Sequence, residues 1–360
     1  MSNGPPRTRS EHLRDPRLPS VFSRAEAREA GMSDRQIDRR LAAGVWKRLR
    51  RGCFELNAAP ASSEPARAQD DSAKASLVAT AMALKDREVA VSHQSAALLY
   101  GLPNPLGGRP TPTFTGGDGP VRLRTGAHVL VAPLPAVDRT TTADGFAITT
   151  PERTVADCLR VSPPADGLAI ADAALRRGIR REGLLQVLDR QKGWPGIVLA
   201  RRLAQLADPR RETPLESWSA WTFDQGAVPR PIWQAEIYGW DGEFCGRVDC
   251  WWQAGLVGEA DGRAKYLLAA AERGGADAKR LGQVLDLERR REQKIRWTRA
   301  DVVRWGPWQV RGHASGELAS EVIGRLAEAS LARRFRGTIV VPPLPLPQTT
   351  VKAGPLLLKR

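Results

Sequence analysis

Residues 246–266 constrain the fold of this chain more than any other stretch, and they read GRVDCWWQAGLVGEADGRAKY. Two short and largely apolar runs, 248–252 and 256–260, flank three residues that end in a glycine. This pattern is typical of two antiparallel strands joined by a short loop. We therefore expect a β-hairpin in which Trp252 lies opposite Leu256.

The same register is expected to place three carboxylates on one face of the hairpin. Asp249 lies opposite Glu259, Asp261 follows two residues later, and side chains alternate across a strand. Directly opposed residues have Cβ atoms about 5 Å apart, and carboxylates that close repel one another unless a proton or a cation is present. Mg²⁺, which prefers oxygen ligands, is the expected cofactor. The alternative is a surface hairpin whose acids are solvated and balanced by Arg247, Arg263 and Lys265.

Three segments around the hairpin carry a resemblance to a known nuclease family. They are PLESWSAW, which contains Glu216, then RVDCWW, then GEADG followed by KY. This order resembles the Vsr-like branch of the PD-(D/E)xK nuclease superfamily. The resemblance implies a restriction-endonuclease-like α/β domain in which Asp249 and Glu259 bind the metal and Glu216 is an accessory ligand. The pattern departs at Asp261, which stands where the family has a lysine, and Lys265 is the candidate to supply that cation. The candidate catalytic residues are thus Glu216, Asp249, Glu259, Asp261 and Lys265.

The charge of the chain indicates a polyanionic partner. Its 360 residues carry a formal net charge of +15, and its pI is near 10.5. Such a balance favours nucleic acid over a membrane surface, and no apolar run approaches the length of a membrane span. The first residues lack the apolar core of a secretory signal, and the four cysteines are too scattered for a disulfide framework. We therefore expect a cytoplasmic protein that binds double-stranded DNA.

Two short helices with strong start signals are expected near the N-terminus. Ser23 with Glu26, and Ser33 with Gln36, each match the capping box that begins a helix. Two capped helices separated by a tight turn are typical of a helix-turn-helix motif. The next segment, VWKRLRRGCFEL, has β-like runs around a glycine and suits the wing of a winged helix.

The second helix and the wing display the candidate DNA-binding side chains. A recognition helix enters the major groove while cations of a wing contact phosphates. Arg35, near the start of its helix, is the best candidate for a contact with a guanine base. The alternative is a charged, solvated face on a small helical adaptor. The full candidate set is Arg35, Arg39, Arg40, Lys47, Arg48, Arg50 and Arg51.

Residues 20–160 carry a second resemblance, to AbiEi-like antitoxins, the regulators of type IV toxin–antitoxin systems. The segments that carry it are VFSRAEAREAGMSDRQIDRRLAAGVWKRLRRGCF, VSHQSAALLYGLP and TTPERTVADCLR, in that order. The resemblance implies a winged helix that binds operator DNA and represses its own operon. It also implies a nucleotidyltransferase-like toxin as partner.

Together these patterns predict an α+β protein of several domains. The predicted order is a disordered arm (1–19), a winged helix-turn-helix (20–57), a linker (58–72), an AbiEi-like middle α/β region (73–212), a Vsr-like domain (213–335) and a Pro-rich tail (336–360). Three functions remain open: a DNA-binding regulator fused to a nuclease-fold domain, an active Mg²⁺-dependent endonuclease that is targeted by its winged helix, and an interaction protein with an inactive nuclease fold. The departure at Asp261 favours the first and the third.

Overall fold

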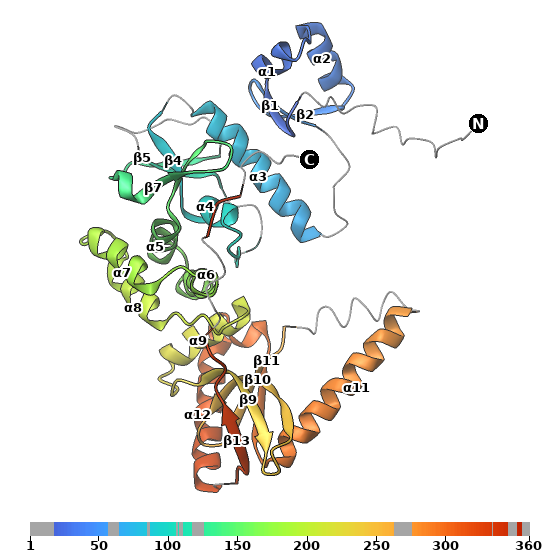
Figure 1. The fold of residues 1–360 in the computed structure, drawn as a ribbon, viewed down its shortest axis with the longest axis vertical. Helices are drawn as coiled ribbons and strands as arrows, with labels where there is room; N and C mark the ends of the chain where they lie inside the picture. The colour runs from blue at the N-terminus through green and yellow to red at the C-terminus, as the bar shows by residue number, and fades with distance from the viewer. Residues whose placement is uncertain are drawn as a thin grey trace. The chain divides into compact units, whose positions relative to one another are not determined.

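The computed structural model of this chain describes residues 18–56, 65–84, 87–105, 107, 111–116, 126–262, 276–332, 334–344 and 351–354. The chain divides into two compact units with mixed helices and strands (Figure 1). The first unit takes in the described residues up to 158, residues 182–192 and the described residues after 350. The second takes in residues 159–181 and the described part of 193–349.

The N-terminal part of the first unit is a small sheet with two capped helices. Its elements are β1 (Val21–Ser23), α1 (Arg24–Glu29), α2 (Asp34–Ala42), β2 (Trp46–Arg50) and β3 (Cys53–Leu56), and the strand order is β1-β3-β2. Both predicted capping boxes are present, so the two helices begin where the sequence indicated. The core beneath them is aromatic: the rings of Phe22 and Trp46 meet edge to face with centroids 4.6 Å apart, and Phe54 lies beside both.

The rest of the first unit is built on a second sheet of five short strands with the order β6-β5-β4-β8-β7. The long helix α3 precedes this sheet and also packs against β1, β2 and β3. The elements are α3 (Pro65–Ala83), β4 (Val89–Val91), α4 (His93–Leu99), β5 (Thr113–Gly116), β6 (His128–Leu130), β7 (Arg139–Thr141), β8 (Ala147–Thr149) and α5 (Pro151–Val161). Helix α7 (Arg181–Arg190) follows later in the chain, and most of it belongs to this unit.

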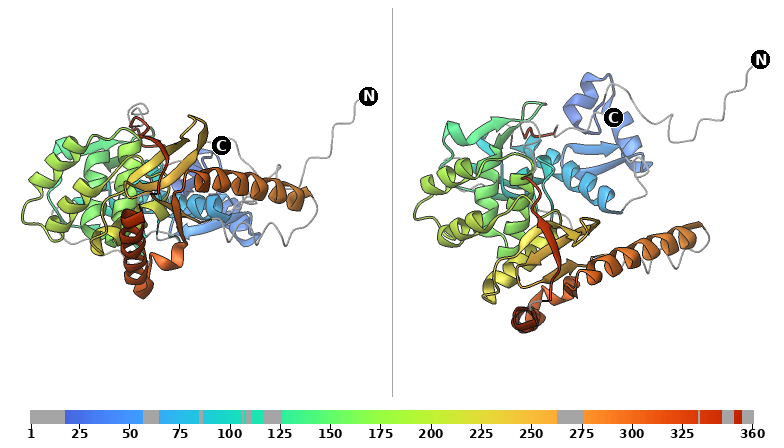
Figure 2. Two further views of the ribbon diagram at one scale, coloured as in Figure 1. Left: turned by 90° about the horizontal axis from the view of Figure 1, so that it is seen from below. Right: turned by 60° about the horizontal axis from the view of Figure 1, so that its bottom comes forward.

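The second unit carries a five-stranded sheet with the order β12-β11-β10-β9-β13. Strands β11 and β12 are parallel, and the other neighbours are antiparallel. The strands lie between the long helices α12 and α11 (Figure 1), and α11 extends beyond the edge of the sheet (Figure 2). The elements are α6 (Pro164–Arg176), α8 (Ile197–Leu206), α9 (Pro214–Gln225), β9 (Ile232–Gly239), β10 (Phe244–Trp252), β11 (Leu256–Ala260), α11 (Ala276–Trp297), β12 (Asp301–Trp305), α12 (Ser315–Ala332) and β13 (Gly337–Val340).

Two segments differ from the sequence prediction. Residues 58–72 were predicted to be a linker, but α3 begins at Pro65, inside that range. Proline is favoured at the first position of a helix, and the residues that follow it are mostly good helix formers. Residues 336–360 were predicted to be a Pro-rich tail, but β13 lies within them and pairs with β9 along the sheet. The pairing supplies the backbone hydrogen bonds that an isolated tail would lack.

No helix within the described part of the chain is both long enough and apolar enough to cross a membrane.

Candidate functional site

The hairpin at the centre of the second unit has the predicted register. Strands β10 and β11 pair Trp252 with Leu256 and Cys250 with Gly258, which confirms the alignment read from the sequence. One step further along this register, Asp249 and Glu259 face each other. The Asp249 carboxylate accepts a hydrogen bond of 2.7 Å from the backbone N–H of the residue after Glu259. The two acids are therefore brought together as expected.

The acids around the hairpin lie in a poorly hydrated environment. Burial, and then the charge of Asp249, raises the pKa of Glu259 to about 7. The same two causes, in the same order, raise the pKa of Glu216 to about 7. Burial and then the three carboxylates also raise the pKa of the Cys250 thiol. A buried carboxylate without full compensation favours its protonated form, so the ionised forms of Glu216 and Glu259 are energetically unfavourable here.

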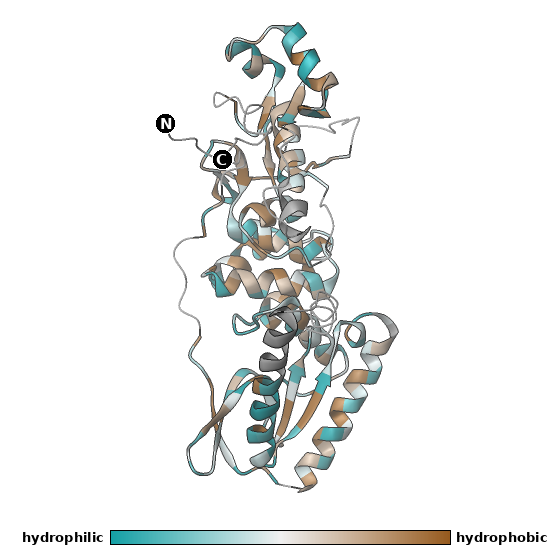
Figure 3. Cartoon of the chain, turned by 90° about the vertical axis from the view of Figure 1, so that its right-hand side faces the viewer, coloured by the Kyte–Doolittle hydropathy of each residue, from teal (hydrophilic) through white to brown (hydrophobic). Residues whose placement is uncertain are grey.

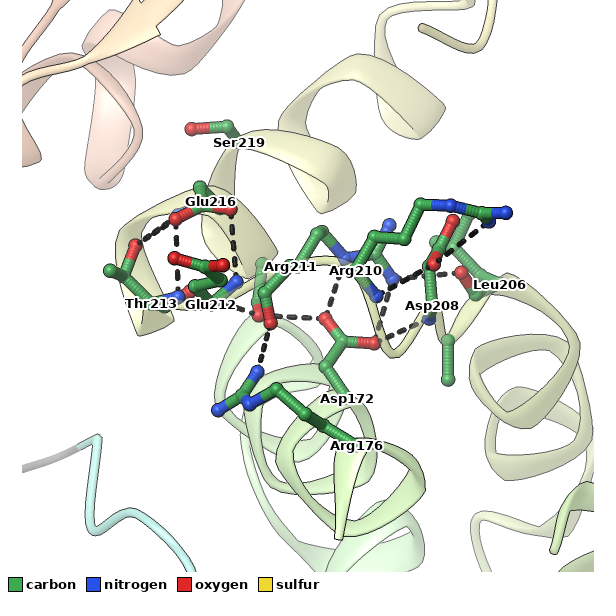
Figure 4. Close-up of polar contacts among 12 residues, drawn as sticks. Asp172, Arg176, Leu206, Asp208, Arg210, Arg211, Glu212, Thr213, Glu216 and Ser219 are labelled. Atoms are coloured by element: carbon green, nitrogen blue, oxygen red, sulfur yellow. Dashed lines mark hydrogen bonds and ion pairs between the residues drawn. The ribbon is translucent and has the colours of Figure 1, made fainter. Parts of the chain in front are cut away.

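The Glu216 carboxylate is held by a capping box at the start of α9. Its oxygens accept hydrogen bonds from the backbone N–H groups of Glu212 (3.0 Å) and Thr213 (3.2 Å), and from the Thr213 hydroxyl (2.8 Å), as Figure 4 shows. The side-chain amide of Gln234 donates a fourth bond of 2.9 Å. Four donors occupy both oxygens, so Glu216 fixes the helix start and its lone pairs are directed away from an ion.

An arginine that was not among the candidate residues lies against the acid pair. The Arg291 guanidinium on α11 lies 3.2 Å from Oε1 of Glu259 and 3.0 Å from the carboxylate of Glu288. Oε1 of Glu259 is buried and accepts no hydrogen bond from the described residues. The contact with Arg291 is thus an ion pair without hydrogen-bond geometry. The sequence offered a weak signal for it, a run of cations at residues 288–292, but not which of them turns inward.

The remaining candidate catalytic residues are Asp261 and Lys265. Strand β11 ends at Ala260, and Asp261 beyond it is exposed, with its backbone N–H bonded to the carbonyl of Trp305. Lys265 lies outside the described residues. Within the part of the chain that the structure describes, no group of three or more His, Cys, Asp or Glu side chains is arranged to hold a metal ion.

The residues present do not fit a Mg²⁺ site as they stand. The ion requires close octahedral coordination by oxygens. Glu216 is saturated by four donors, one Asp249 oxygen accepts a backbone N–H, and Oε1 of Glu259 faces the Arg291 guanidinium. An ion could bind Oε1 of Glu259 only after Arg291 had moved away. The predicted ligands Asp249 and Glu259 are adjacent, but among the described residues they are not part of a group of three or more metal-ligating side chains.

The two N-terminal helices are tied together by surface ion pairs. Arg24 contacts Asp34 at 2.8 Å and Asp38 at 2.6 Å, while Arg28 contacts Asp34 at 2.7 Å. The guanidinium groups of Arg28 and then Arg24 lower the pKa of Asp34. Both acids of α2 are thereby neutralised from α1, and the remaining charge of α2 is positive. The hydrophilic character of these helices is visible in Figure 3.

The predicted DNA-binding residues fall into two groups by exposure. Arg35 and Arg39 on α2 are exposed, as are the β2–β3 residues Lys47, Arg48 and Arg51. Arg40 and Arg50 are half-buried. The guanidinium of Arg40 lies 5.4 Å from the ring centroid of Trp46, a distance at which the cation and the ring attract each other. The surface available to a partner is therefore formed by the five exposed cations.

Comparison with known proteins gives a match at the same segment. A family model described as "Transcriptional regulator, AbiEi antitoxin" matches residues 16–57. Two curated proteins of Mycobacterium tuberculosis, named only as the uncharacterized proteins MT2308 and Rv2248, are each 35% identical to this chain over 109 residues. The aligned segment covers 30% of this chain and 40% of each relative. The N-terminal segment is thus similar to transcriptional regulators of the AbiEi antitoxin type.

Proposed function

We propose that this chain is a DNA-binding transcriptional regulator of the AbiEi antitoxin type, with a winged helix-turn-helix at residues 20–57. One observation carries the proposal: five exposed cations lie on α2 and on the β2–β3 hairpin, while the acids of α2 are neutralised by α1. The family match at residues 16–57 supports the same function, and the net charge of +15 agrees with a polyanionic partner.

In this proposal the two cationic elements have different roles. Helix α2 enters the major groove, and Arg35 in its first turn contacts a base. The exposed cations of the β2–β3 hairpin contact the phosphate backbone and set the orientation of the helix. The Ser33 capping box fixes where α2 begins, and therefore where Arg35 projects.

Fluorescence anisotropy of the full chain on labelled duplexes tests this function. The sequence that it prefers is first selected from a random pool. Replacing Arg39, Arg48 and Arg51 together with Ala should weaken binding and lower the salt slope by about three units, one for each phosphate that is no longer neutralised. A matched control removes three exposed cations of the same unit outside the segment, Arg87, Arg139 and Lys192. Equal weakening in both variants would overturn the assignment of DNA binding to residues 20–57.

The family description also names an antitoxin, so we propose a toxin partner. A nucleotidyltransferase-like toxin is the expected one. Growth rescue checks it: the toxin is expressed from the neighbouring gene with and without this chain. Failure to rescue, combined with intact DNA binding, would leave a regulator that is not an antitoxin.

We further propose that the second unit contains a nuclease-type domain of the Vsr-like PD-(D/E)xK class that serves as a scaffold. The strand order supports this: an antiparallel meander β9-β10-β11 is followed by α11 and by β12, which is parallel to β11. The adjacent acids Asp249 and Glu259 occupy the two strands that such a site uses. Fold and activity are separable, because activity depends on the site itself.

A Mg²⁺-dependent endonuclease is the second candidate function. The adjacent positions of Asp249 and Glu259 favour it, whereas the engaged lone pairs do not. If cleavage occurs, Lys265 is its proposed cation, and nicking should be lost in Lys265→Met and retained in Arg263→Met. Incubation of supercoiled DNA with the full chain and Mg²⁺ or Mn²⁺ decides between the candidates. Nicking that disappears in Asp249→Asn would replace the scaffold assignment.

A further inference from the structure

Arg291 makes contacts that fix its charged group against the hairpin. Its guanidinium lies 3.2 Å from Oε1 of Glu259, donates a 2.6 Å hydrogen bond to the backbone carbonyl of Arg247, and pairs with Glu288 on its own helix. The side chain is 26% exposed, so these contacts are only partly screened by water. The guanidinium is therefore held at the same time by both strands of the hairpin and by its own helix.

A glycine on β10 makes room for this arginine. A Cβ atom at Gly246 would lie 2.9 Å from Cγ and 3.2 Å from Cδ of Arg291, closer than side-chain atoms pack. The methylene stem therefore lies directly over the glycine backbone, and the guanidinium reaches past it to Glu259. Ile295, one turn further along α11, is buried in the core beside Val248 and fixes the rotation of the helix. The arrangement is set by the core and by the missing side chain, not by a flexible surface contact.

We propose that Arg291 is the resident counter-cation of Glu259, the buried member of the acid pair, and takes the position that a divalent ion would need at this carboxylate. A buried carboxylate requires a compensating positive charge, and an arginine supplies it permanently because its guanidinium does not lose its proton. A metal ion bound to Oε1 of Glu259 would have to displace a side chain that also bonds to Arg247 and Glu288. Arg291 therefore supplies, without a metal, part of the positive charge that the buried carboxylate of Glu259 requires.

This inference deepens the proposed scaffold function of the second unit and is independent of DNA binding by residues 20–57. It predicts that the wild-type chain does not respond to divalent ions and that removal of Arg291 creates the response. In Arg291→Met the hydrophobic stem is retained while the charge is removed. Glu259 then lacks the cation that contacts it, so the variant should unfold at a lower temperature, and Mn²⁺ or Mg²⁺ should restore part of the difference.

The test is thermal unfolding of the full chain in EDTA and in millimolar MnCl₂ or MgCl₂, together with calorimetric titration of the same ions. Wild type should show no binding heat and no shift. Arg291→Met should gain about 5 °C on addition of the ion, the size expected for a ligand well above its dissociation constant. Combining it with Asp249→Asn should abolish the gain. Arg290→Met, which removes an exposed cation of the same helix, is the matched control and should behave as wild type.

A second variant keeps the proposal falsifiable should Arg291→Met fail to fold. Arg291→Gln keeps a hydrogen-bond donor on this side chain but removes its charge, so it should also acquire a response to Mn²⁺. Ion binding by the wild-type chain that is abolished in Asp249→Asn would overturn the proposal. Absence of any ion response in both Arg291→Met and Arg291→Gln would overturn it as well. Neither result would affect DNA binding, so the two proposals fail separately.

Discussion

The two charged regions of this protein compensate their charges in opposite ways. In residues 18–56 the acids of α2 are paired with α1 arginines at the surface, and five other cations stay exposed. At the β10–β11 hairpin Glu259 is buried, Asp249 is half-buried, and Arg291 of the distant helix α11 contacts Glu259. Exposed charges cost little and remain available to a partner. Buried charges require a counter-charge from within the protein. Whether a charged segment can bind a partner molecule therefore depends less on its number of charges than on whether those charges are already paired within the protein.

The largest expected effect is a pH dependence of stability caused by the hairpin acids. Burial and the charge of Asp249 raise the folded-state pKa of Glu259 from 4.5 to about 7, while Arg291 and Arg304 oppose the shift. The folded state thus binds the proton more tightly than the unfolded state. The free energy of unfolding should fall as pH rises from about 4.5 to about 7, by on the order of 3 kcal/mol for one such group, and then level off.

Urea unfolding of the full chain in EDTA at pH 5 and at pH 8 measures this effect. Glu259→Gln, whose amide does not titrate, should have a flatter profile. The similar shift at Glu216 should leave a residual slope in that variant. A variant whose profile matches that of wild type would show that Glu259 is not the buried, incompletely compensated acid described above.

The next largest effect is a difference in stability between two variants of the same region, at the buried Glu216 and at the exposed Asp261. Glu216→Ala removes the acceptor of four hydrogen bonds at the start of α9 and should cost about 2–3 kcal/mol of unfolding free energy. Asp261→Ala, at an exposed position beyond the end of β11, should be close to neutral. Chemical denaturation of both variants provides the measurement. Equal costs would mean that Asp261 belongs to the buried acid group.

In the exposed region the largest effect is expected at Arg35. Arg35→Ala should cost about 1–3 kcal/mol on the preferred duplex and little on random DNA, because the variant cannot bond to a base while its phosphate-binding cations remain. Anisotropy titrations on the two duplexes give both values. A uniform weakening on both would assign Arg35 to the phosphate backbone.

A smaller and less specific effect is expected at the tip of the β2–β3 hairpin. Replacing Arg50 and Arg51 with Ala should weaken binding to all duplexes and reduce the salt slope by about one unit for each phosphate that is no longer neutralised. Because Arg50 is half-buried and Arg51 is exposed, the single variants separate the two. The hairpin would lose its assigned role if the double variant bound like wild type at every salt concentration.

The smallest effect concerns the ion pairs between α1 and α2. Replacing Asp34 and Asp38 with Asn removes surface pairs and should lower the unfolding temperature only slightly, with the difference vanishing in high salt. DNA affinity should rise modestly, since two negative charges leave the binding surface. A large drop in stability would show that these pairs are structural and would weaken the contrast between the regions.

The two regions also differ in how much of their structure could be predicted from the sequence. The hairpin register followed from alternation and one glycine, since Gly255 takes the turn with φ of 91°. The helix starts at Ser23 and Ser33 followed from capping residues three positions apart. These features depend on contacts between near neighbours, and residue types at fixed spacing are enough to indicate them.

The rest depended on contacts between distant segments. Sequence spacing suggested Lys265 as a cation for the acid pair, and that residue lies outside the described part of the chain. Spacing did not indicate Arg291, which reaches Glu259 from a helix later in the chain. Arg291, rather than another cation of the run at 288–292, contacts Glu259 because Ile295 in the core fixes the rotation of α11. The contact also needs the space that Gly246 leaves on β10. The pairing of β13 with β9 is also long-range. The sequence by itself determined the local elements and the sign of the charge. Only the tertiary structure decided which acids are buried and which cation compensates them, because burial and long-range pairing are properties of the packed fold.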